Sequence, residues 1–219
     1  MSRTTDLLVA PCARAAAKFA AQRWHYSGTL PNGKIACFGV WENGVYVGAI
    51  VYGRGANNHM SSPFGLVQTE CVELVRIALT EHAAPVTQMI AASLRQLRAA
   101  CPGLRLIVSY ADTAQGHHGG VYQAANWLYT GARGSSDAYY FVNGEKTHGR
   151  TVSNYARYRK RADETSLDYV RRTLDPHAYR MRDLPVKHRY ILPLNKTTRR
   201  VLRRLHQPYP RRDTEVRTP

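Results

Sequence analysis

The stretch Lys34–Tyr52, KIACFGVWENGVYVGAIVY, decides the fold of this chain. Two runs rich in β-branched and aromatic residues, Lys34–Trp41 and Val45–Tyr52, flank the dipeptide Asn43-Gly44. Asparagine and glycine tolerate the positive φ angles of a tight two-residue turn, so this pattern predicts a β-hairpin. The fold is therefore built on a sheet, and the segments on both sides of the hairpin supply its other layers.

Helical and strand patterns alternate on both sides of this hairpin. Ala10–Trp24 is alanine-rich, and apolar side chains recur in it at helical spacing, at Cys12, Ala15, Ala16, Phe19 and Ala20. The further strands that we predict are Thr69–Leu79, Leu104–Tyr110, Trp127–Thr130 and His188–Leu194. The further predicted helices are Pro85–Ala100, Gly119–Ala125, Ser166–Leu174 and Thr197–Leu205. A second Asn-Gly, Asn143-Gly144, predicts a second hairpin of Tyr139–Val142 and Glu145–His148. The pattern predicts an α/β fold, a mixed central sheet flanked by helices.

Positive charge is concentrated in the last third of the chain. The 219 residues include 31 Lys and Arg against 15 Asp and Glu, a formal net charge of +16. Residues Met1–Gly149 carry a net charge of +4 and residues Arg150–Pro219 a net charge of +12. An arginine-rich segment beside a nearly neutral one is typical of a protein that binds a polyanion, most often nucleic acid. We expect a core domain over 1–149 and a basic segment over 150–219 that packs on this core; the alternative is a solvated basic tail.

Cysteine usage and hydropathy indicate the compartment. Cys12, Cys37, Cys71 and Cys101 are widely spaced and form no CxxC pair, which is typical of reduced thiols rather than a disulfide framework or a zinc site. No apolar run approaches the roughly 18 residues of a membrane span, and the first residues do not form a signal-peptide pattern. We therefore expect a cytoplasmic protein that does not bind membranes, while its oligomeric state stays open.

The strand Thr69–Leu79 carries a carboxylate on an apolar face. Strict alternation would place Glu73 on one face with Thr69, Cys71, Val75 and Ile77. A lone carboxylate there is costly unless it is paired or functional, so Glu73 is a candidate for catalysis or substrate positioning. Glu70 and Arg76 share the other face at a separation too large for direct contact. The alternative for these charged residues is a structural ion network.

A polar segment follows the predicted buried strand Leu104–Tyr110. It reads SYADTAQGHHGG from Ser109 to Gly120 and supplies an acid, two imidazoles and several glycines. Ligands bind at the carboxyl ends of strands in open α/β sheets, so Asp112 and His117 are candidate site residues. One alternative is an ordinary turn in which Asp112 caps a helix. Another is a metal site of Asp112, one of the adjacent histidines His117 and His118, and a further histidine.

Two further segments suit contacts with a nucleic acid. Trp24-His25-Tyr26-Ser27 ends the first predicted helix with side chains that stack or form hydrogen bonds, as a pocket for an unstacked base requires. The alternative is a helix end whose tryptophan packs in the core while the histidine and tyrosine cap it. Arg54 lies between two glycines, where it contacts either a phosphate or only its own turn.

The connection before the helix Pro85–Ala100 argues against a coenzyme A donor. Enzymes that transfer acyl groups from coenzyme A hold its pyrophosphate on the amides of a glycine-bearing loop between strand and helix. The connection here, Thr80–Pro85, reads TEHAAP, contains no glycine and places Glu81 where it would repel a phosphate. We therefore do not expect an acyl-CoA-type donor, and the donor itself stays open.

Several blocks of the sequence resemble the Mom proteins of bacteriophages. In chain order they are Trp24–Ser27, Gly39–Glu42, Tyr52–Ala56, Glu70–Arg76, Ser109–Gly119, Val121–Gly131, Lys187–Tyr190 and Pro208–Pro210. This resemblance implies a GNAT-like fold and a protein that acts in the host cytoplasm. It also implies an enzyme that adds a carbamoylmethyl (acetamido) group to the exocyclic amine of adenine in double-stranded DNA, which protects phage DNA from host restriction. The family suggests an acyl-carrier donor, and iron is a possible cofactor through Asp112 and His117.

The residues that match these blocks are the candidate site. They are His25, Tyr26, Ser27, Arg54, Glu73, Arg76, Ser109, Asp112, His117, Tyr122 and Tyr129. An adenine amine is a poor nucleophile because it is conjugated with its ring, so we expect Asp112 or Glu73 to accept its proton. The base must leave the helical stack, and we expect His25, Tyr26 and Tyr122 to line its pocket.

The backbone of the DNA would be held by basic residues of the late segment. They are Arg157, Arg159, Lys160 and Arg161 in the Arg/Tyr-rich stretch, and Arg199, Arg200, Arg203 and Arg204 in the last predicted helix. Two other functions stay open from sequence alone. One is a CoA-dependent N-acetyltransferase of a small amine or a protein. The other is a non-catalytic nucleic-acid-binding protein.

Overall fold

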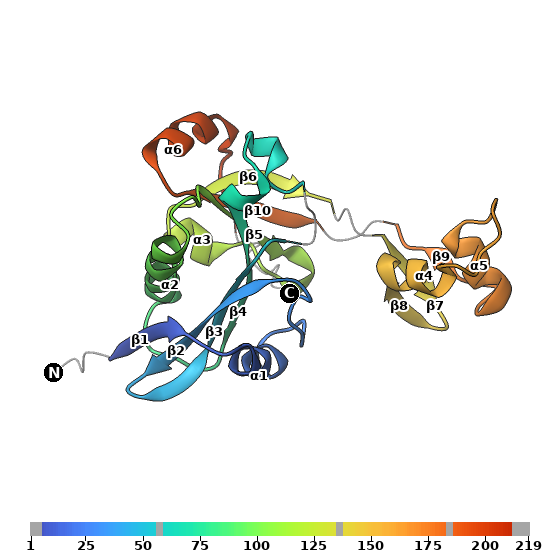
Figure 1. Cartoon of the computed structure of the whole chain (residues 1–219), viewed down its shortest axis with the longest axis horizontal. Coiled ribbons are helices and arrows are strands. Elements are labelled where there is room, and N and C mark those ends of the chain that lie inside the picture. Colours follow the sequence, from blue (N-terminus) through green and yellow to red (C-terminus); the bar gives the residue numbers. More distant parts are fainter. Residues whose placement is uncertain (1–5, 56–58, 135–137, 183–185, 212–219) are drawn as a thin grey trace, which may run out of the picture. The chain divides into compact units, whose positions relative to one another are not determined.

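The computed structural model describes residues 6–55, 59–134, 138–182 and 186–211 (Figure 1). The chain forms two compact units. The core unit comprises residues 1–111, 116–131 and 188–219, and the inserted unit comprises residues 112–115 and 132–187. These units divide the chain at other positions than residue 149. The second predicted hairpin belongs to the inserted unit, and the segment from His188 onward belongs to the core unit.

A mixed sheet forms the centre of the core unit. Within the described residues it has seven strands in the order β1-β2-β3-β4-β5-β10-β6. Their bounds are β1 Leu7–Pro11, β2 Ile35–Glu42, β3 Val45–Gly53, β4 Cys71–Leu79, β5 Leu106–Asp112, β6 Leu128–Arg133 and β10 Lys187–Pro193. Strands β1 to β4 pair antiparallel, and β4 pairs parallel with β5. The predicted first hairpin is confirmed: Asn43 and Gly44 have φ angles of 50° and 79° between β2 and β3.

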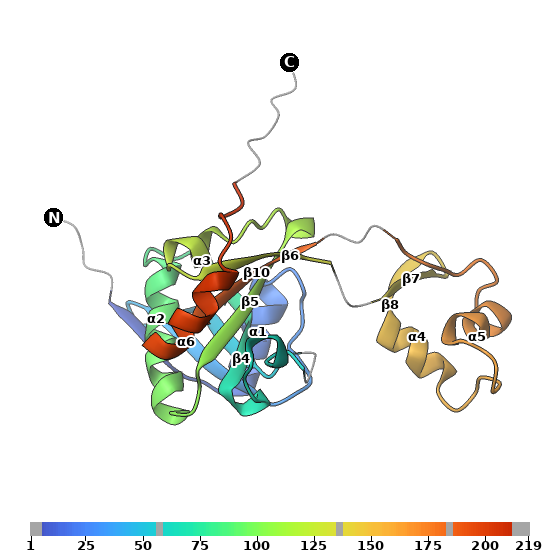
Figure 2. The ribbon, with the colours of Figure 1, turned by 90° about the horizontal axis from the view of Figure 1, so that it is seen from above.

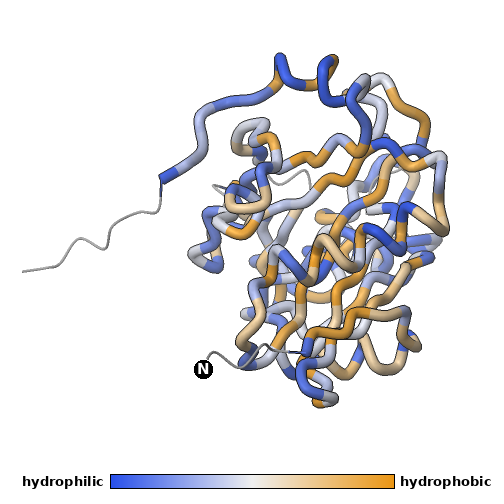
Figure 3. Tube along the Cα trace, turned by 90° about the vertical axis from the view of Figure 1, so that its left-hand side faces the viewer, coloured by the Kyte–Doolittle hydropathy of each residue, from blue (hydrophilic) through white to orange (hydrophobic). Residues whose placement is uncertain are grey.

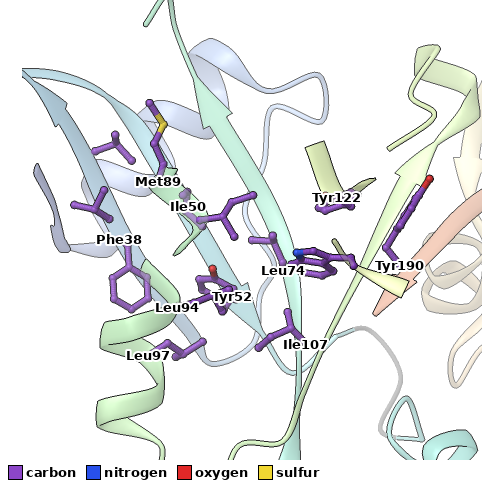
Figure 4. Close-up of a cluster of buried hydrophobic side chains, with 14 of the residues drawn as sticks. Phe38, Ile50, Tyr52, Leu74, Met89, Leu94, Leu97, Ile107, Tyr122 and Tyr190 are labelled. Carbon is purple, nitrogen blue, oxygen red and sulfur yellow. The ribbon is translucent and has the colours of Figure 1, made fainter. Parts of the chain in front are cut away.

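Helices cover both faces of this sheet (Figure 2). They are α1 Arg14–Trp24, α2 Val86–Ala100, α3 Gly120–Ala124 and α6 Lys196–Leu202. Because side chains alternate along β3, Ala49 and Val51 pack against α1, while Ile50 and Tyr52 face the cluster that includes α2. Figure 4 shows this second cluster, and Figure 3 shows hydrophobic segments following the strands. The expected mixed α/β fold is therefore confirmed, and no helix of the described residues is long and apolar enough to cross a membrane.

The segment from His188 onward completes the core unit. Strand β10 lies between β5 and β6 in the sheet. Tyr190 on β10 is fully buried, and the Tyr209 hydroxyl donates to the carbonyl of Trp127 at 2.6 Å. This part of the basic segment is thus packed on the sheet, as the sequence predicts.

The first predicted helix starts later than expected. Leu7–Pro11 forms the edge strand β1, which pairs with β2 from Leu7↔Glu42 to Pro11↔Phe38, so α1 begins only at Arg14. The buried face of α1 also differs from the expected one: Ala17, Ala20 and Ala21 are buried, whereas Phe19 is 46% exposed. The alanine pattern predicts the helix correctly but not which side of it faces the sheet.

A β-bulge in β4 changes the expected alternation. Val51 pairs with Arg76 and Tyr52 with Leu74, so Val75 is an extra residue on β4. Leu74 and Ile77 consequently pack with the cluster on the α2 side, while Val75 packs with the cluster on the α1 side. The prediction that Ile77 shares a face with Val75 is therefore wrong.

The inserted unit has its own small sheet and core. Strands β7 Tyr139–Val142, β8 Glu145–His148 and β9 Tyr179–Arg180 pair in the order β8-β7-β9, and the helices are α4 Gly149–Ala156 and α5 Ser166–Thr173. Val142, Val152, Val170 and Ala178 form its buried cluster. The second predicted hairpin is confirmed, because Asn143 and Gly144 connect β7 and β8 at φ angles of 50° and 80°.

Candidate functional site

The parallel strands β4 and β5 pair along only part of their length. Their pairs are Cys71↔Leu106, Val72↔Ile107 and Glu73↔Val108, whereas β4 continues to Leu79 along β3. A cavity of about 560 Å³ adjoins the carboxyl-terminal halves of the two strands. Its walls come from the end of α1 (residues 24–26), from β4 (74–77), from the end of β5 (110–111) and from residues 116–122, with Val86 of α2. The structure therefore brings together the end of α1, β4 and the segment from the end of β5 to α3, which are far apart in the sequence.

His25 enters this cavity as a neutral ring. Its Nδ1 accepts a hydrogen bond from the backbone N–H of Ser27 at 3.1 Å and lies 2.8 Å from the Ser27 hydroxyl. Burial, together with the positive charges of Arg76 and His117, lowers the pKa of His25 to about 4. Because Nδ1 is an acceptor, the proton of the neutral ring is on Nε2. His25 is thus a weak base but a hydrogen-bond donor at neutral pH.

The rings of Tyr26 and His117 lie beside His25 at the cavity wall. Tyr26 stacks on His25 with ring centroids 4.3 Å apart, and His117 meets Tyr26 edge-on at 5.8 Å. Tyr26 is 54% exposed and also lines the cavity. The three side chains that sequence analysis took from two different blocks therefore form one aromatic surface. A flat ring system is the ligand that such a surface binds best.

Tyr122 forms a buried part of the cavity wall. Its side chain packs between Trp127 and Tyr190, with centroids at 5.0 and 5.2 Å (Figure 4). Burial raises the pKa of Tyr122 to about 12, so the phenol stays protonated. The Ser109 hydroxyl lies 2.8 Å from that of Tyr122 and 2.9 Å from the carbonyl of Leu74. The Leu74 carbonyl can only accept, so both bonds form together when Ser109 donates to Leu74 and the Tyr122 phenol donates to Ser109; a ligand that accepts the phenol proton would replace the bond to Ser109.

Arg76 and Glu73 flank this cavity on β4. Arg76 donates to the carbonyls of Thr29 (3.0 Å) and Val75 (2.6 Å) and lines the cavity. Burial lowers the pKa of Arg76, and the charges of Tyr26 and Glu73 oppose this effect. The Glu73 carboxylate lies against Gly55, where a Cβ would come within 2.8 Å of Oε2. Glu73 also raises the pKa of Tyr122, after the larger effect of burial. Glu73 is thus electrostatically coupled to two cavity residues without lining the cavity itself.

Other predicted site residues have structural partners. Asp112 belongs to the inserted unit: its Oδ1 accepts from the N–H of Ala114 at 3.0 Å, and its Oδ2 lies 3.8 Å from Lys187 Nζ. This is the capping turn that sequence analysis gave as the alternative. Tyr129 is buried with its hydroxyl 2.9 Å from His188 Nδ1, so it is not accessible to DNA. Glu70 pairs with Arg105 at 2.8 Å, as the structural alternative predicts.

The candidate metal ligands are not gathered into a centre. Across residues 6–55, 59–134, 138–182 and 186–211, no group of three or more His, Cys, Asp or Glu side chains is placed to hold an ion. Asp112 has the contacts just described, and His117 packs on Tyr26. The residues present do not fit an iron site. All four cysteines carry free thiols.

The basic residues lie in both units. Arg157, Arg159, Lys160 and Arg161 are exposed in the turn after α4 of the inserted unit. Arg200 and Arg203 are exposed at α6 of the core unit, where Arg199 Nη2 donates to the carbonyl of Asn126 at 3.4 Å. Arg54 is exposed just after β3. These positions leave the predicted phosphate contacts accessible.

Glu42 is the residue that sequence analysis missed. Its carboxylate accepts from the backbone N–H of Ala83 at 2.9 Å and of Ala84 at 2.6 Å, just before α2. Glu42 is only 8% exposed. Burial alone would raise its pKa, but the two backbone hydrogen bonds lower it below the usual value. A carboxylate of the protein therefore holds the amides that would otherwise face an anionic ligand. No local pattern predicts a contact across 41 residues.

Replacing Glu42 with alanine is expected to destabilise the core unit. The change leaves the N–H groups of Ala83 and Ala84 without their acceptor. Ala84 is buried, so its unpaired N–H costs about 1–3 kcal/mol, whereas Ala83 is exposed and its N–H can bind water instead. Urea unfolding at pH 7 measures this effect. The matched control is Glu81→Ala, an exposed carboxylate in the same connection. Equal stability of the two variants would contradict the role assigned to Glu42.

Acid is expected to weaken the fold through His25. Its pKa is about 4 in the folded chain and 6.5 ordinarily, so the unfolded chain takes up a proton first as the pH falls. The contribution of neutral His25 to stability is therefore complete above pH 6.5 and is lost between pH 6.5 and 4. Urea unfolding at pH 7 and pH 5 should show a smaller loss for His25→Gln than for the unchanged protein. A control is His82→Gln, at an exposed histidine; equal losses for all three proteins would contradict the prediction.

Comparison with known proteins identifies the family of this chain. No curated protein matches the chain. Similar solved structures include one described as a probable GNAT-family acetyltransferase from Chromobacterium violaceum, with 10% identity, a TM-score of 0.46 and coverage of 87% of this chain and 84% of that one. Another is a Bacillus subtilis acetyltransferase in complex with CoA, with 10% identity, a TM-score of 0.43 and coverage of 88% and 100%. The model of the Mom protein family matches residues 6–211, nearly the whole chain. The chain therefore belongs to the Mom protein family.

Proposed function

We propose that this chain is a DNA-modification transferase that adds a carbamoylmethyl group to the exocyclic amine of adenine. The observation that carries the proposal is the cavity between β4 and β5, with stacked His25 and Tyr26 on one wall and Tyr122 on another. Its volume of about 560 Å³ lies in the range of small-molecule sites, roughly 300–1,000 Å³. Such a cavity has room for a flipped base and the group that it receives.

The residues of the cavity suit recognition of a flipped adenine. Tyr26 offers its ring for stacking, and the Nε2–H of neutral His25 is a donor for a ring nitrogen of the base. Arg76 fixes the segment after α1 through its hydrogen bond to the carbonyl of Thr29. Stacking and edge-on hydrogen bonding together select a base and hold it in one orientation.

The chemical step requires a proton acceptor and an electrophilic carbon. The amine nitrogen attacks this carbon, its new C–N bond forms as the bond to the leaving group breaks, and the amine loses a proton. We assign the proton to Glu73 rather than to Asp112, with one water as the relay, because Glu73 does not line the cavity itself. Glu73 belongs to the core unit and acts electrostatically on Arg76 and Tyr122 of the cavity wall, whereas Asp112 belongs to the inserted unit. The protonated phenol of Tyr122 donates a hydrogen bond to the donor molecule or to its leaving group.

The donor in this proposal does not bind through a diphosphate at α2. The amides of Ala83 and Ala84 already hold Glu42, and a second anion there would meet its negative charge. This arrangement disfavours the alternative of a CoA-dependent N-acetyltransferase. Titration of the purified protein with acetyl-CoA tests the point, since tight binding with saturation would overturn it.

Mass spectrometry tests the activity itself. Nucleosides from plasmid DNA of cells that express the chain are compared with those of an empty-vector control. We expect a new deoxyadenosine with the mass of a carbamoylmethyl addition. The variant Tyr122→Phe tests the hydrogen bond assigned to the Tyr122 phenol. It keeps the packing against Trp127 and Tyr190 and removes the donor hydroxyl. Unmodified DNA from soluble, folded protein in a host that supports the reaction of another family member would contradict the proposal.

A further inference from the structure

We propose that Tyr158 of the inserted unit is a base-stacking residue, which places its ring against a nucleobase while the neighbouring cations contact phosphates. The inference rests on the proposed function only in taking DNA as the partner. It concerns a surface that lies apart in sequence from the cavity residues. Its parts are the turn Arg157–Arg161 and the helix α4 that precedes it.

The ring of Tyr158 is presented to solvent rather than packed. The side chain is 91% exposed, although tyrosine is a residue that normally buries most of its area. Its neighbours anchor the turn instead: Ala156 is buried, and its carbonyl accepts from the N–H groups of Arg159 (3.0 Å) and Lys160 (3.1 Å). The fold thus holds the backbone around Tyr158 firmly while it leaves the ring outside.

The backbone of Tyr158 adopts a conformation that favours glycine. Its φ angle is +63°, in the left-handed region, which costs free energy for any residue with a Cβ. A tyrosine at this position gains no core packing in return. Its ring contact is with the guanidinium of Arg157, 5.1 Å from the ring centre. Stability alone does not explain this residue, so a contact outside the fold is its physical reason.

The surroundings of Tyr158 are positively charged. Arg157, Arg159, Lys160 and Arg161 are all exposed. The nearby carboxylate of Glu164 is already bound, to Arg172 at 2.7 Å and to the N–H of Arg161 at 2.9 Å, and Arg172 lowers the pKa of Glu164 to about 2. Asp163 is the other acid of this turn. The positive charge around the ring is therefore only partly balanced.

An exposed ring within a cluster of cations fits a nucleic acid. Phosphates attract the cations, and every base offers a flat face on which an aromatic ring stacks. Proteins that deform a duplex also insert single side chains between base steps, which unstacks them. Bases and phosphates alternate at short intervals along a DNA strand. The single protein turn Arg157–Arg161 therefore reaches a base and its flanking phosphates together.

The experiment uses the full-length protein, a fluorescent DNA oligonucleotide and heparin, a polyanion without bases. Tyr158→Gly removes the ring and accepts a φ of +63° without strain, so its unfolding midpoint should be unchanged or higher. We expect this variant to bind DNA about 5- to 150-fold more weakly, the effect of one lost base–aromatic stack. Its affinity for heparin should not change, and Tyr158→Phe should bind DNA as the unchanged protein does.

The salt dependence separates the ring from the charges. The slope of log K against log salt concentration should be the same for Tyr158→Gly and the unchanged protein. It should become shallower by about 0.9 for Lys160→Gln if that residue contacts one phosphate. Unaltered DNA affinity of Tyr158→Gly would overturn the inference, as would an equal loss of DNA and heparin binding. So would binding of the unchanged protein to anionic phospholipid vesicles but not to DNA. If the unchanged protein modifies adenine but Tyr158→Gly keeps its DNA affinity, only this inference is refuted. If Tyr158→Gly loses affinity as expected but the unchanged protein yields no modified adenine, the result counts only against the proposed function.

Discussion

Replacing Glu73 with glutamine is expected to reduce adenine modification by a factor of about 10²–10⁴, the usual contribution of a positioned general base. Glutamine keeps the size and shape of the side chain beside Gly55 but cannot take up the amine proton. The expected result is a fall in the ratio of modified to unmodified deoxyadenosine, measured by mass spectrometry at equal expression. Circular dichroism should show a folded variant, and urea unfolding measures the stability lost with the Glu73 charge near Arg76.

The matched control for this experiment is Asp112→Asn. Asparagine preserves an acceptor for the N–H of Ala114 and gives up only the weak ion pair with Lys187 at 3.8 Å. We expect this variant to retain most of the modification. Full activity of Glu73→Gln together with loss of activity in Asp112→Asn would reverse the assignment of the base.

The parts of the fold that the sequence predicts are those with local signals. Asn43-Gly44 and Asn143-Gly144 adopt the positive φ angles that their side chains tolerate, and both hairpins follow. The helix after Pro85 begins at Val86 and ends at Ala100, because the fixed φ of Pro85 suits the residue before a helix and Pro102-Gly103 cannot continue it. In each case a few adjacent residues determine the backbone.

The parts that sequence analysis missed depend on distant partners. β1 is a strand because β2 offers it an edge, although its last residue is Pro11. The bulge at Val75 depends on the register between β3 and β4 and leaves no mark in the local pattern. Glu42 binds amides 41 and 42 residues away. Such contacts follow from the assembled sheet and not from the composition of either segment.

The candidate site also contains residues of both kinds, those whose role residue type predicts and those whose role depends on distant partners. His25, Tyr26, Arg76, His117 and Tyr122 line one cavity. Ser109 and Tyr129 are buried and act through hydrogen bonds to Tyr122 and His188. Residue type predicts the chemistry of a side chain, while the three-dimensional packing decides whether a ligand reaches it.

Replacing Gly119 with alanine is expected to destabilise the core unit by more than about 3 kcal/mol, the sum of a left-handed backbone and an overpacked core. Gly119 has a φ of +83° directly before α3, and a Cβ there would overlap the ring of Tyr190. That ring has little room to move. It packs against Tyr122 and Tyr129, with centroids 5.2 Å away in each case, and its hydroxyl donates to the carbonyl of His118 at 2.6 Å.

The control for this prediction separates the clash from the backbone conformation. Gly116 has a similar φ of +66°, but a Cβ there meets no atom within 4 Å, so Gly116→Ala should cost only the backbone contribution of about 1 kcal/mol. Urea unfolding compares the two variants. The double variant Gly119→Ala with Tyr190→Leu should lose less stability than the sum of the two single changes, because the smaller side chain makes room for the methyl group. Equal losses for Gly119→Ala and Gly116→Ala would mean that the Tyr190 ring moves freely. In that case the wall that holds Tyr122 would not be rigid, and the precise placement of its phenol in the cavity would need another cause.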